Sequence, residues 1–381
     1  MSESKDSIVD LISAVEAKSK NVHTQSLDLS FNELLDMKKS KELNITPDFQ
    51  RLFRWTEGSR SRFIESLLLE MPVPPIYVVE EANGSYILID GLQRISSYLH
   101  LRGELEADHL DQPVKIGEKL VLTDCDIVRE LNGKTYDDLG TALQIRLKRA
   151  FVRVEVVRKG SDPHFKYHMF KRLNTGGEIL SPQQVRNCTI RLLNPKFIDF
   201  TRSLSTYKEY EICTEYLTYE QRLAAFNEEL ILRFFALKNN RNGFKHDVSD
   251  FLTDYMEAVS DPLESKINFD YEKEKLIFEK TFSILANTLG DLSFGYPNRS
   301  KKISRAFGIY QYEAFVLGLQ PYLDKIELTN KDLLETLSKC FEEIKLNAEF
   351  ITMTTGGGKN SKGPLRDRVT FVEESIAKVL K

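Results

Sequence analysis

The chain has 381 residues, a length that indicates two domains or one domain with a large extension. Hydrophobic residues make up 41% and charged residues 29%, an ordinary globular balance with ample material for a core. The 53 Lys and Arg residues against 57 Asp and Glu leave a net charge of −4, which excludes a uniformly basic surface. Any contact with nucleic acid therefore needs a local basic patch.

Cysteine usage and hydropathy indicate a cytoplasmic protein. The four cysteines are scattered without paired spacing, which argues against a zinc site or a disulfide framework. No apolar run approaches the roughly 18–20 residues that span a bilayer, and the N-terminus lacks the apolar core of a signal peptide. We therefore expect no membrane segment.

The first part of the chain predicts alternating helices and strands. Residues 7–17 repeat apolar residues at helical spacing and predict a leading helix. Residues 27–55 indicate a short strand, a short helix and an extended arm. A helix over 59–70 follows, and Pro72 closes it.

Two strands and a further helix come next. Prolines exclude a helix over 72–81, so this segment is extended and runs into a strand. Asn83 and Gly84 predict a turn into a second strand over 85–89. A helix is expected from about residue 92 to residue 102.

The following segments also mix the two kinds of structure. Residues 121–128 resemble a strand, residues 139–150 a helix, and residues 151–157 a strong strand. Residues 162–173 should be helical. A glycine-containing loop then leads to Ser181, where a capping box predicts a helix start.

Beyond about residue 180 nearly all of the sequence has the pattern of amphipathic helix, including residues 221–237, 248–259 and 330–344. The glycine-rich stretch 354–363 predicts a surface loop, because it lacks the spacing of a phosphate-binding Walker loop.

These elements predict an α+β fold, with a mixed core followed by a mostly helical C-terminal region. We divide the chain into a helical lead over 1–26, a nucleotide- or DNA-binding core over 27–180 and a helical domain over 181–381. No Pro/Gly/Ser linker marks the second boundary.

The junction between the strand at 85–89 and the helix at 92–102 carries Asp90, Gly91, Gln93 and Arg94. The first turn of a helix exposes backbone N–H groups and the positive end of the helix dipole, which suits a phosphate. Arg94 adds a bidentate donor, Gln93 offers a donor and an acceptor, and Asp90 is able to hold Mg²⁺ through water. The structural alternative makes Asp90 a helix cap and Arg94 a solvated surface residue.

A second candidate segment surrounds Trp55, the single tryptophan, and carries Gln50, Arg51 and Arg54. Arginines interleaved with aromatic residues hold phosphates and offer stacking faces to bases. Alternatively, the aromatic residues anchor the core while the arginines extend to solvent, and we favour this alternative for the aromatic residues and a functional role for Arg51.

The third candidate segment is the loop that contains Asn174, Thr175 and Gly176. Its glycines present backbone N–H groups, and the two polar side chains suit a phosphate or a ribose. A plain turn between two helices explains the glycines equally well, so both interpretations stay open.

Four ordered motifs resemble a known family. DFQRLFRW, IESLLLEMPVPPIYV, IDGLQR and RLNTGGEILSPQQVRN are similar to the N-terminal domain of GmrSD-type modification-dependent restriction systems. The resemblance implies a fold like ParB and sulfiredoxin domains, and a nucleotide-binding, NTP-hydrolysing module with Mg²⁺ that acts against foreign DNA. Its signature Asp-Gly-Gln-Gln-Arg is carried here by Asp90, Gly91, Gln93 and Arg94, with Leu92 in place of the first glutamine. With Leu92 at this position, we expect nucleotide binding to be retained more readily than hydrolysis.

The resemblance also implies partners. Family members carry, or work beside, an HNH-type nuclease, and none of the six histidines here lies in a recognisable nuclease motif. A separate nuclease subunit is therefore the expected partner besides nucleotide and DNA, and a homo-oligomer stays open. Two rival functions remain: a DNA sensor without turnover, and a metal-dependent nickase with Asp90 as metal ligand. Three basic clusters, at 146–149, 241–246 and 298–305, are solvated faces unless they converge into a DNA track.

Overall fold

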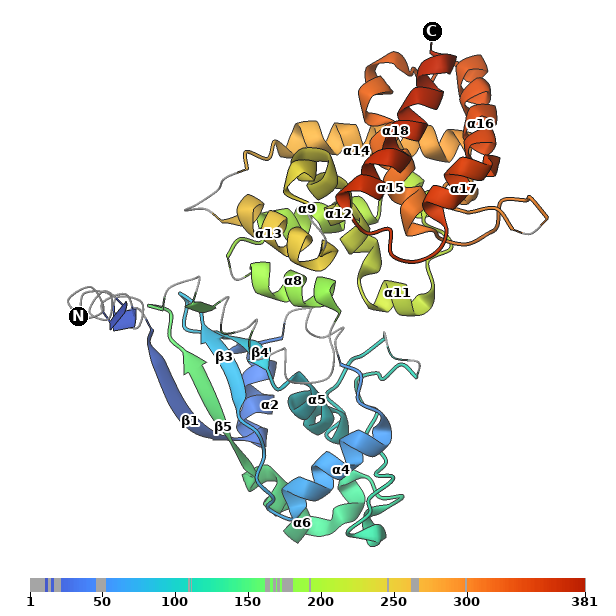
Figure 1. The fold of residues 1–381 in the computed structure, drawn as a ribbon. Coiled ribbons are helices and arrows are strands. Elements are labelled where there is room, and N and C mark those ends of the chain that lie inside the picture. Colours follow the sequence, from blue (N-terminus) through green and yellow to red (C-terminus); the bar gives the residue numbers. More distant parts are fainter. Residues whose placement is uncertain are drawn as a thin grey trace, which may run out of the picture. The chain divides into compact units, whose positions relative to one another are not determined.

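The chain divides into two compact units, residues 1–180 and residues 181–381 (Figure 1). The computed structural model describes residues 11–12, 15–16, 22–45, 53–108, 110, 112–161, 165–166, 169, 172, 181–191, 193–244, 247–261, 267–298 and 300–380. Most of the predicted helices at 7–17 and 162–173 lies outside these residues.

The first unit is built on a five-stranded mixed sheet in the order β1-β5-β3-β4-β2. The β1–β5 and β3–β4 pairs are antiparallel, and the β5–β3 and β4–β2 pairs are parallel. The strands are β1 (Thr24–Ser30), β2 (Leu43–Asn44), β3 (Ile76–Glu80), β4 (Tyr86–Asp90) and β5 (Phe151–Val157). The helices are α2 (Phe31–Lys39), α4 (Glu57–Leu68), α5 (Leu92–Leu101) and α6 (Gly140–Arg149), with short 3₁₀ turns at Arg129–Leu131 and Tyr136–Leu139.

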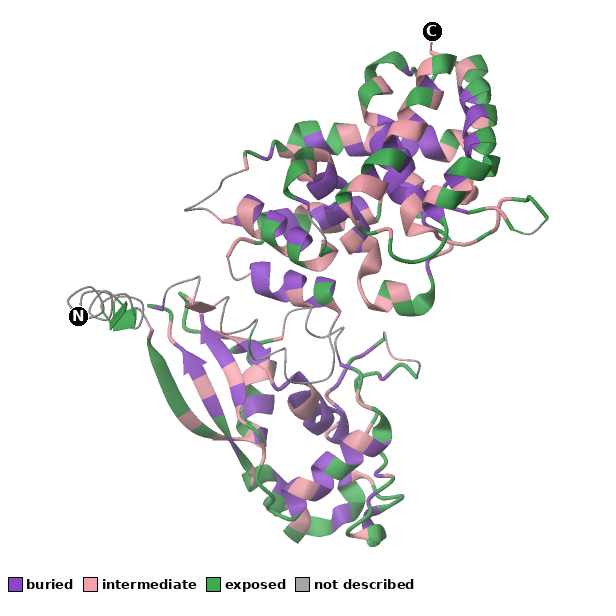
Figure 2. Ribbon diagram, in the orientation of Figure 1, coloured by how far each residue is buried: buried purple, intermediate pink, exposed green. Residues whose placement is uncertain are grey.

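The core of this unit lies between the sheet and its helices (Figures 1 and 2). In β5, Val152, Val154 and Val156 are buried while the alternate side chains face outward, as the period of two in a half-buried strand requires. Phe31 of α2 joins the helices, because its ring contacts Phe63 of α4 at 5.6 Å and Tyr98 of α5 at 5.5 Å between centroids.

The predicted strand at 121–128 is wrong. These residues form an irregular segment in which Leu122 N donates to the carbonyl oxygen of Lys134, while several of the following backbone N–H groups donate to side chains. Ser61 Oγ accepts from Thr123 at 3.0 Å, and the buried carboxylate of Glu65 accepts from Ile127 at 3.1 Å and Val128 at 2.6 Å. Polar side chains on α4 thus replace the ladder that a strand would need.

The second unit is helical throughout the part that the structure describes. Its helices are α8 (Pro182–Arg191), α9 (Lys196–Ser205), α10 (Lys208–Cys213), α11 (Tyr219–Leu223), α12 (Phe226–Asn240), α13 (Val248–Ser260), α14 (Tyr271–Thr288), α15 (Ile309–Gly318), α16 (Lys331–Leu346), α17 (Ala348–Thr354) and α18 (Lys362–Val379), with 3₁₀ turns at Arg241–Gly243, Gly290–Leu292 and Gln320–Lys325. Stacked phenylalanines fill its core, as in the Phe278–Phe282 pair at 4.4 Å between centroids.

Two details of this unit test predictions made from the sequence. The capping box at the start of α8 is confirmed: Ser181 N donates to Gln184 Oε1 at 3.0 Å, and Gln184 N donates to Ser181 Oγ at 3.2 Å. The single helix predicted over 221–237 is wrong, because Ala225 has a left-handed backbone with φ 56° and separates α11 from α12.

A chain of alternating buried charges runs through the second unit. Arg186 of α8 binds Glu229 at 2.7 Å, Glu229 binds Arg233 at 3.3 Å, and Arg233 binds Glu313 of α15 at 2.7 Å. Arg368 of α18 completes the chain through the second oxygen of Glu313. Glu229, Arg233 and Glu313 each lie between two charges of opposite sign, which offsets part of the cost of their desolvation.

The α+β class with a helical C-terminal region is therefore confirmed. All four cysteines are free and buried, and burial raises the pKa of Cys125 to about 11 and that of Cys213 to about 12. Among the described residues, no helix has both the length and the apolar character that crossing a membrane demands. The likeness to ParB and sulfiredoxin stays a prediction.

Lys345 is the buried cation that lacks a carboxylate neighbour in the described part of the second unit. Its Nζ donates to the carbonyl oxygen of Gly295 at 2.9 Å and to Gln311 Oε1 at 3.2 Å, and lies 4.6 Å from the centroid of the Phe315 ring. Burial lowers the pKa of Lys345 from 10.5 to about 7. Folding therefore favours the neutral amine.

Substituting Lys345→Met should flatten the pH dependence of stability. Between about pH 7 and about pH 10 the unfolded chain holds a proton on Lys345 that the folded chain releases, so the free energy of unfolding rises with pH by up to about 1.4 kcal/mol per unit. Urea unfolding at about pH 7 and about pH 9 measures this slope. Lys339→Met, on the exposed side of the same helix, is the control and should keep it. Equal slopes in wild type and Lys345→Met would contradict the assignment.

Candidate functional site

The predicted junction is a strand–glycine–helix turn. β4 ends at Asp90, Gly91 has φ 103°, and α5 begins at Leu92 without a side-chain cap. A Cβ on Gly91 would lie 2.7 Å from Ile76 Cγ1 and 3.3 Å from Arg94 Nη2. The position therefore needs glycine both for its backbone conformation and for its close approach to β3.

Arg94 is held at this turn by two oxygens. Its Nη2 donates to Asp90 Oδ2 at 2.7 Å and to the carbonyl oxygen of Pro75 at 3.0 Å. The side chain is only 14% exposed, and its Nε is buried without a hydrogen-bond partner. Asp90 thus orients the guanidinium, and a solvated surface arginine is excluded.

Gln93 connects α5 to the arginine-rich arm. Its Oε1 accepts from the backbone N–H of Arg54 at 3.1 Å and from that of Trp55 at 3.2 Å. The side chain of Gln93 therefore fixes the path of residues 53–55 beside the first turn of α5. Two of the three candidate segments meet here through this amide.

The arm has a structural anchor in Arg60. This buried guanidinium donates to the carbonyl oxygen of Trp55 at 2.7 Å, lies 3.0 Å from His100 Nδ1 and stacks 4.7 Å from the ring centroid of Phe53. Burial, and then the charge of Arg60, lowers the pKa of His100 to about 4, so the imidazole is neutral and accepts from Arg60. Phe53 is fully buried, as expected of a core anchor.

The remaining predicted residues lie outside the described part of the chain. These are Gln50, Arg51, Asn174, Thr175 and Gly176. The described residues of the prediction, Asp90, Gly91, Gln93, Arg94 and the backbone of Arg54, do lie at one turn. We also expect all three candidate segments to fold into one cationic hollow. This stays a prediction, because the third segment lies outside the described residues.

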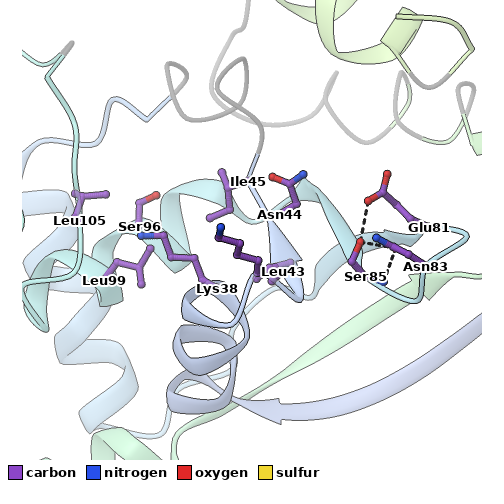
Figure 3. A pocket seen from close by; sticks show the side chains of 11 residues that line it. Lys38, Leu43, Asn44, Ile45, Glu81, Asn83, Ser85, Ser96, Leu99 and Leu105 are labelled. Carbon is purple, nitrogen blue, oxygen red and sulfur yellow. Dashed lines mark hydrogen bonds between the residues drawn. The ribbon is translucent and has the colours of Figure 1, made fainter.

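A cavity of about 430 Å³ lies in the same unit (Figure 3). Lys38 of α2, Asn44 of β2 and Ser96 of α5 give it polar walls, and the aliphatic groups of Leu43 and Leu99 line it too. Burial lowers the pKa of Lys38, whose Nζ donates to the carbonyl oxygen of Glu104 at 3.0 Å. Of the predicted site residues that the structure describes, Arg54, Asp90, Gly91, Gln93 and Arg94, none lines this cavity.

Metal ligands are sparse at the turn. Among the described residues, no group of three or more His, Cys, Asp or Glu side chains converges on one point. Asp90 is the carboxylate of the turn, and Mg²⁺ is often held by one or two carboxylates together with substrate phosphates. A metal at this turn would therefore need the phosphates of a nucleotide as further ligands.

Sequence reasoning missed two contributors to the turn. The carbonyl of Pro75 binds Arg94, and the only signal was the proline-rich segment that keeps 72–75 extended. Arg60 lies buried on α4 and holds the arm through the carbonyl of Trp55, and no pattern in the sequence indicates this role.

Fold and turn together define the first unit as an α+β module that holds an arginine at a strand–glycine–helix junction. Residues 31–191 match the model of the GmrSD restriction endonuclease N-terminal domain. This match confirms the resemblance of the four motifs to that domain, whose family is one of restriction systems. Comparison with curated proteins and with solved structures finds no match.

Gly91→Ala should destabilise the first unit more than Gly84→Ala. Both glycines have positive φ, 103° and 88°, but only Gly91 has heavy atoms within 4 Å of an added Cβ. Left-handed backbone costs both variants roughly 1–2 kcal/mol, and the clash with Ile76 adds to this for Gly91→Ala. Urea unfolding of both variants measures the difference. Equal losses would show that the turn relaxes freely.

Gln93→Ala should release the arm at residues 53–55. Two backbone N–H groups lose their acceptor, and Trp55 moves away from Phe63, whose ring centroid lies 5.9 Å away. Because Trp55 is the single tryptophan, a red shift of its fluorescence reports the change directly. Gln93→Glu keeps an acceptor and should retain the wild-type spectrum. An unshifted spectrum in Gln93→Ala would contradict this role.

Proposed function

We propose that the first unit binds a nucleoside triphosphate with Mg²⁺, as the nucleotide-responsive module of a restriction system. The observation that carries this proposal is the guanidinium of Arg94, held by Asp90 and Pro75 beside the uncapped N-terminus of α5. Backbone N–H groups at a helix start and an arginine donor together make a recurrent phosphate site.

The roles at the turn follow from these contacts. Arg94 binds phosphate oxygens, and Asp90 orients Arg94 and meets the metal. Gln93 positions the arm at residues 53–55. In this proposal Arg51, which precedes these residues in the sequence, binds the same phosphates. Asn174, Thr175 and Gly176 complete the nucleotide site in this proposal.

Hydrolysis depends on fewer groups than in the family signature. Leu92 stands where that signature has its first glutamine, and its side chain is buried in the core. It supplies neither a donor nor an acceptor to a water molecule. We therefore propose nucleotide binding as the primary activity, with any turnover relying on Asp90 and Gln93. Binding would couple to DNA recognition, and cutting would fall to a separate HNH-type nuclease subunit.

Arg94→Ala should weaken nucleotide binding. A charge-assisted bond to phosphate contributes roughly 1.5–3 kcal/mol, so the affinity should fall roughly tenfold to a hundredfold. Thermal-shift titration against each NTP with Mg²⁺ detects binding, because a ligand that binds only the folded protein raises its melting temperature. Arg62→Ala, an exposed arginine of α4, is the matched control.

Three results would contradict the proposal. Unchanged affinity in correctly folded Arg94→Ala removes the phosphate role of Arg94. Absence of any NTP-dependent shift, together with DNA binding that falls steeply with salt, favours the DNA sensor instead. Mg²⁺-dependent plasmid nicking that is lost in Asp90→Asn favours a nickase.

A further inference from the structure

An open groove in the first unit lies apart from the turn. It has a volume of about 920 Å³ and runs between α6, the loop after α4 and the start of β5. The residues that line it are Asp28, Leu67, Glu70, Met71, Pro72, Val73, Ala142, Leu143, Ile145, Arg146, Arg149, Ala150, Phe151, Val152 and Arg153. The described residues that are predicted to bind nucleotide are not among them.

Large apolar side chains in this groove face solvent. Phe151 is 69% exposed, Ile145 is 42% exposed and Met71 is 40% exposed. They come from three separate elements and line one hollow. Scattered exposed hydrophobic residues are ordinary, but several on one concave surface indicate a binding surface.

Two of these residues break the pattern of their own elements. On the outward face of β5, Phe151 is followed by Arg153 and Glu155. On α6, Ile145 is flanked by exposed polar and basic residues. Stability of the unit does not explain an apolar residue at either position, since neither side chain is buried.

The loop that forms one wall has a strained backbone. Glu70 has φ 56° at the end of α4, where helices commonly place glycine, and Met71 N donates to Ser66 O at 3.0 Å. The Glu70 carboxylate binds Arg146 of α6 at 2.9 Å across the groove. This exposed ion pair joins the two walls.

The rim of the groove carries positive charge. Arg146 and Arg153 bind Glu70 and Asp28 in exposed pairs, at 2.9 Å and 3.3 Å. Arg149 also lines the groove and has no carboxylate within ion-pair distance among the residues that the structure describes. Exposed pairs contribute little, about 0–1 kcal/mol, so carboxylates of a partner compete for these guanidinium groups readily.

We propose that this groove docks an acidic amphipathic helix of a partner protein. Leu or Phe side chains on one face of that helix fill the hollow against Phe151, Ile145 and Met71. Its Asp and Glu side chains pair with Arg149 and with the rim arginines Arg146 and Arg153. Apolar anchors surrounded by charge complementarity are the usual composition of a helix-in-groove interface.

A protein fits this surface better than a nucleic acid does. The groove floor is aliphatic, with Phe151 as its single aromatic side chain, whereas single-stranded nucleic acid is bound by several aromatic stacking faces.

The test uses the full chain and a synthetic peptide of about five helical turns, with Leu and Phe on one face and Glu on the other. Fluorescence anisotropy should show saturable binding to the wild type. Phe151→Ser and Ile145→Ser should each weaken it roughly tenfold or more. Arg149→Glu should weaken binding of the acidic peptide and strengthen binding of a peptide with Lys in place of Glu.

Two controls make the result specific to the groove. Ile127→Ser removes a side chain that is 59% exposed but lies outside the groove, and it should leave the affinity within about twofold. A scrambled peptide of the same composition lacks the apolar face and should bind at least tenfold more weakly. Circular dichroism of each variant verifies the fold.

Several outcomes would overturn the proposal. Equal binding of the scrambled peptide, or unchanged affinity in both Phe151→Ser and Arg149→Glu, removes the groove as the docking site. Self-association of the wild type that Phe151→Ser abolishes assigns the groove to a second copy of the chain. Competition by duplex DNA assigns it to nucleic acid. These results are independent of NTP binding at Arg94.

Discussion

The close approach of Gly91 to Ile76 is the constraint on which the candidate site depends. With no Cβ in the way, the chain turns from β4 into α5 directly against β3, and the guanidinium of Arg94 reaches the carbonyl of Pro75. Asp90 holds the same guanidinium from the strand side. A single left-handed residue thus sets the position of an arginine relative to the positive end of a helix. The amide of Gln93, one residue earlier in α5, uses this geometry to bring in the arm.

The second unit is organised by charge as well as by aromatic packing. The alternating series from Arg186 to Arg368 joins α8, α12, α15 and α18, which are far apart in sequence. Buried ion pairs are weak sources of stability compared with apolar residues of similar size, but an unpaired member is strongly disfavoured. We infer that the series selects one arrangement of these helices. Arg186 lies within residues 31–191, so the matched range includes the first member of this series of charges.

Periodicity predicted most of the architecture, because the patterns of buried residues differ plainly between strands and helices. β5 alternates, and α13 and α16 follow helical spacing. The failures have local causes. Residues 121–128 have the residue pattern of a strand, but side chains of α4 accept hydrogen bonds from some of their backbone N–H groups. The left-handed backbone of Ala225 is not visible in the sequence, where this residue is one of two adjacent alanines. Sequence located the turn at Asp90 to Arg94 through its residue types. It could not reveal that Arg60 is buried or that Pro75 accepts from Arg94, since both depend on tertiary contacts.

The burial of all four cysteines has a practical consequence. The thiolate is the reactive form of cysteine, and the raised pKa values of Cys125, Cys213 and Cys340 keep them in the thiol form at neutral pH. Alkylating dyes should therefore not react with the native cysteines of the folded protein. Two cysteines introduced on exposed faces could be labelled without reaction of the native four. Distances between the two labels could then be measured by fluorescence transfer without a cysteine-free background.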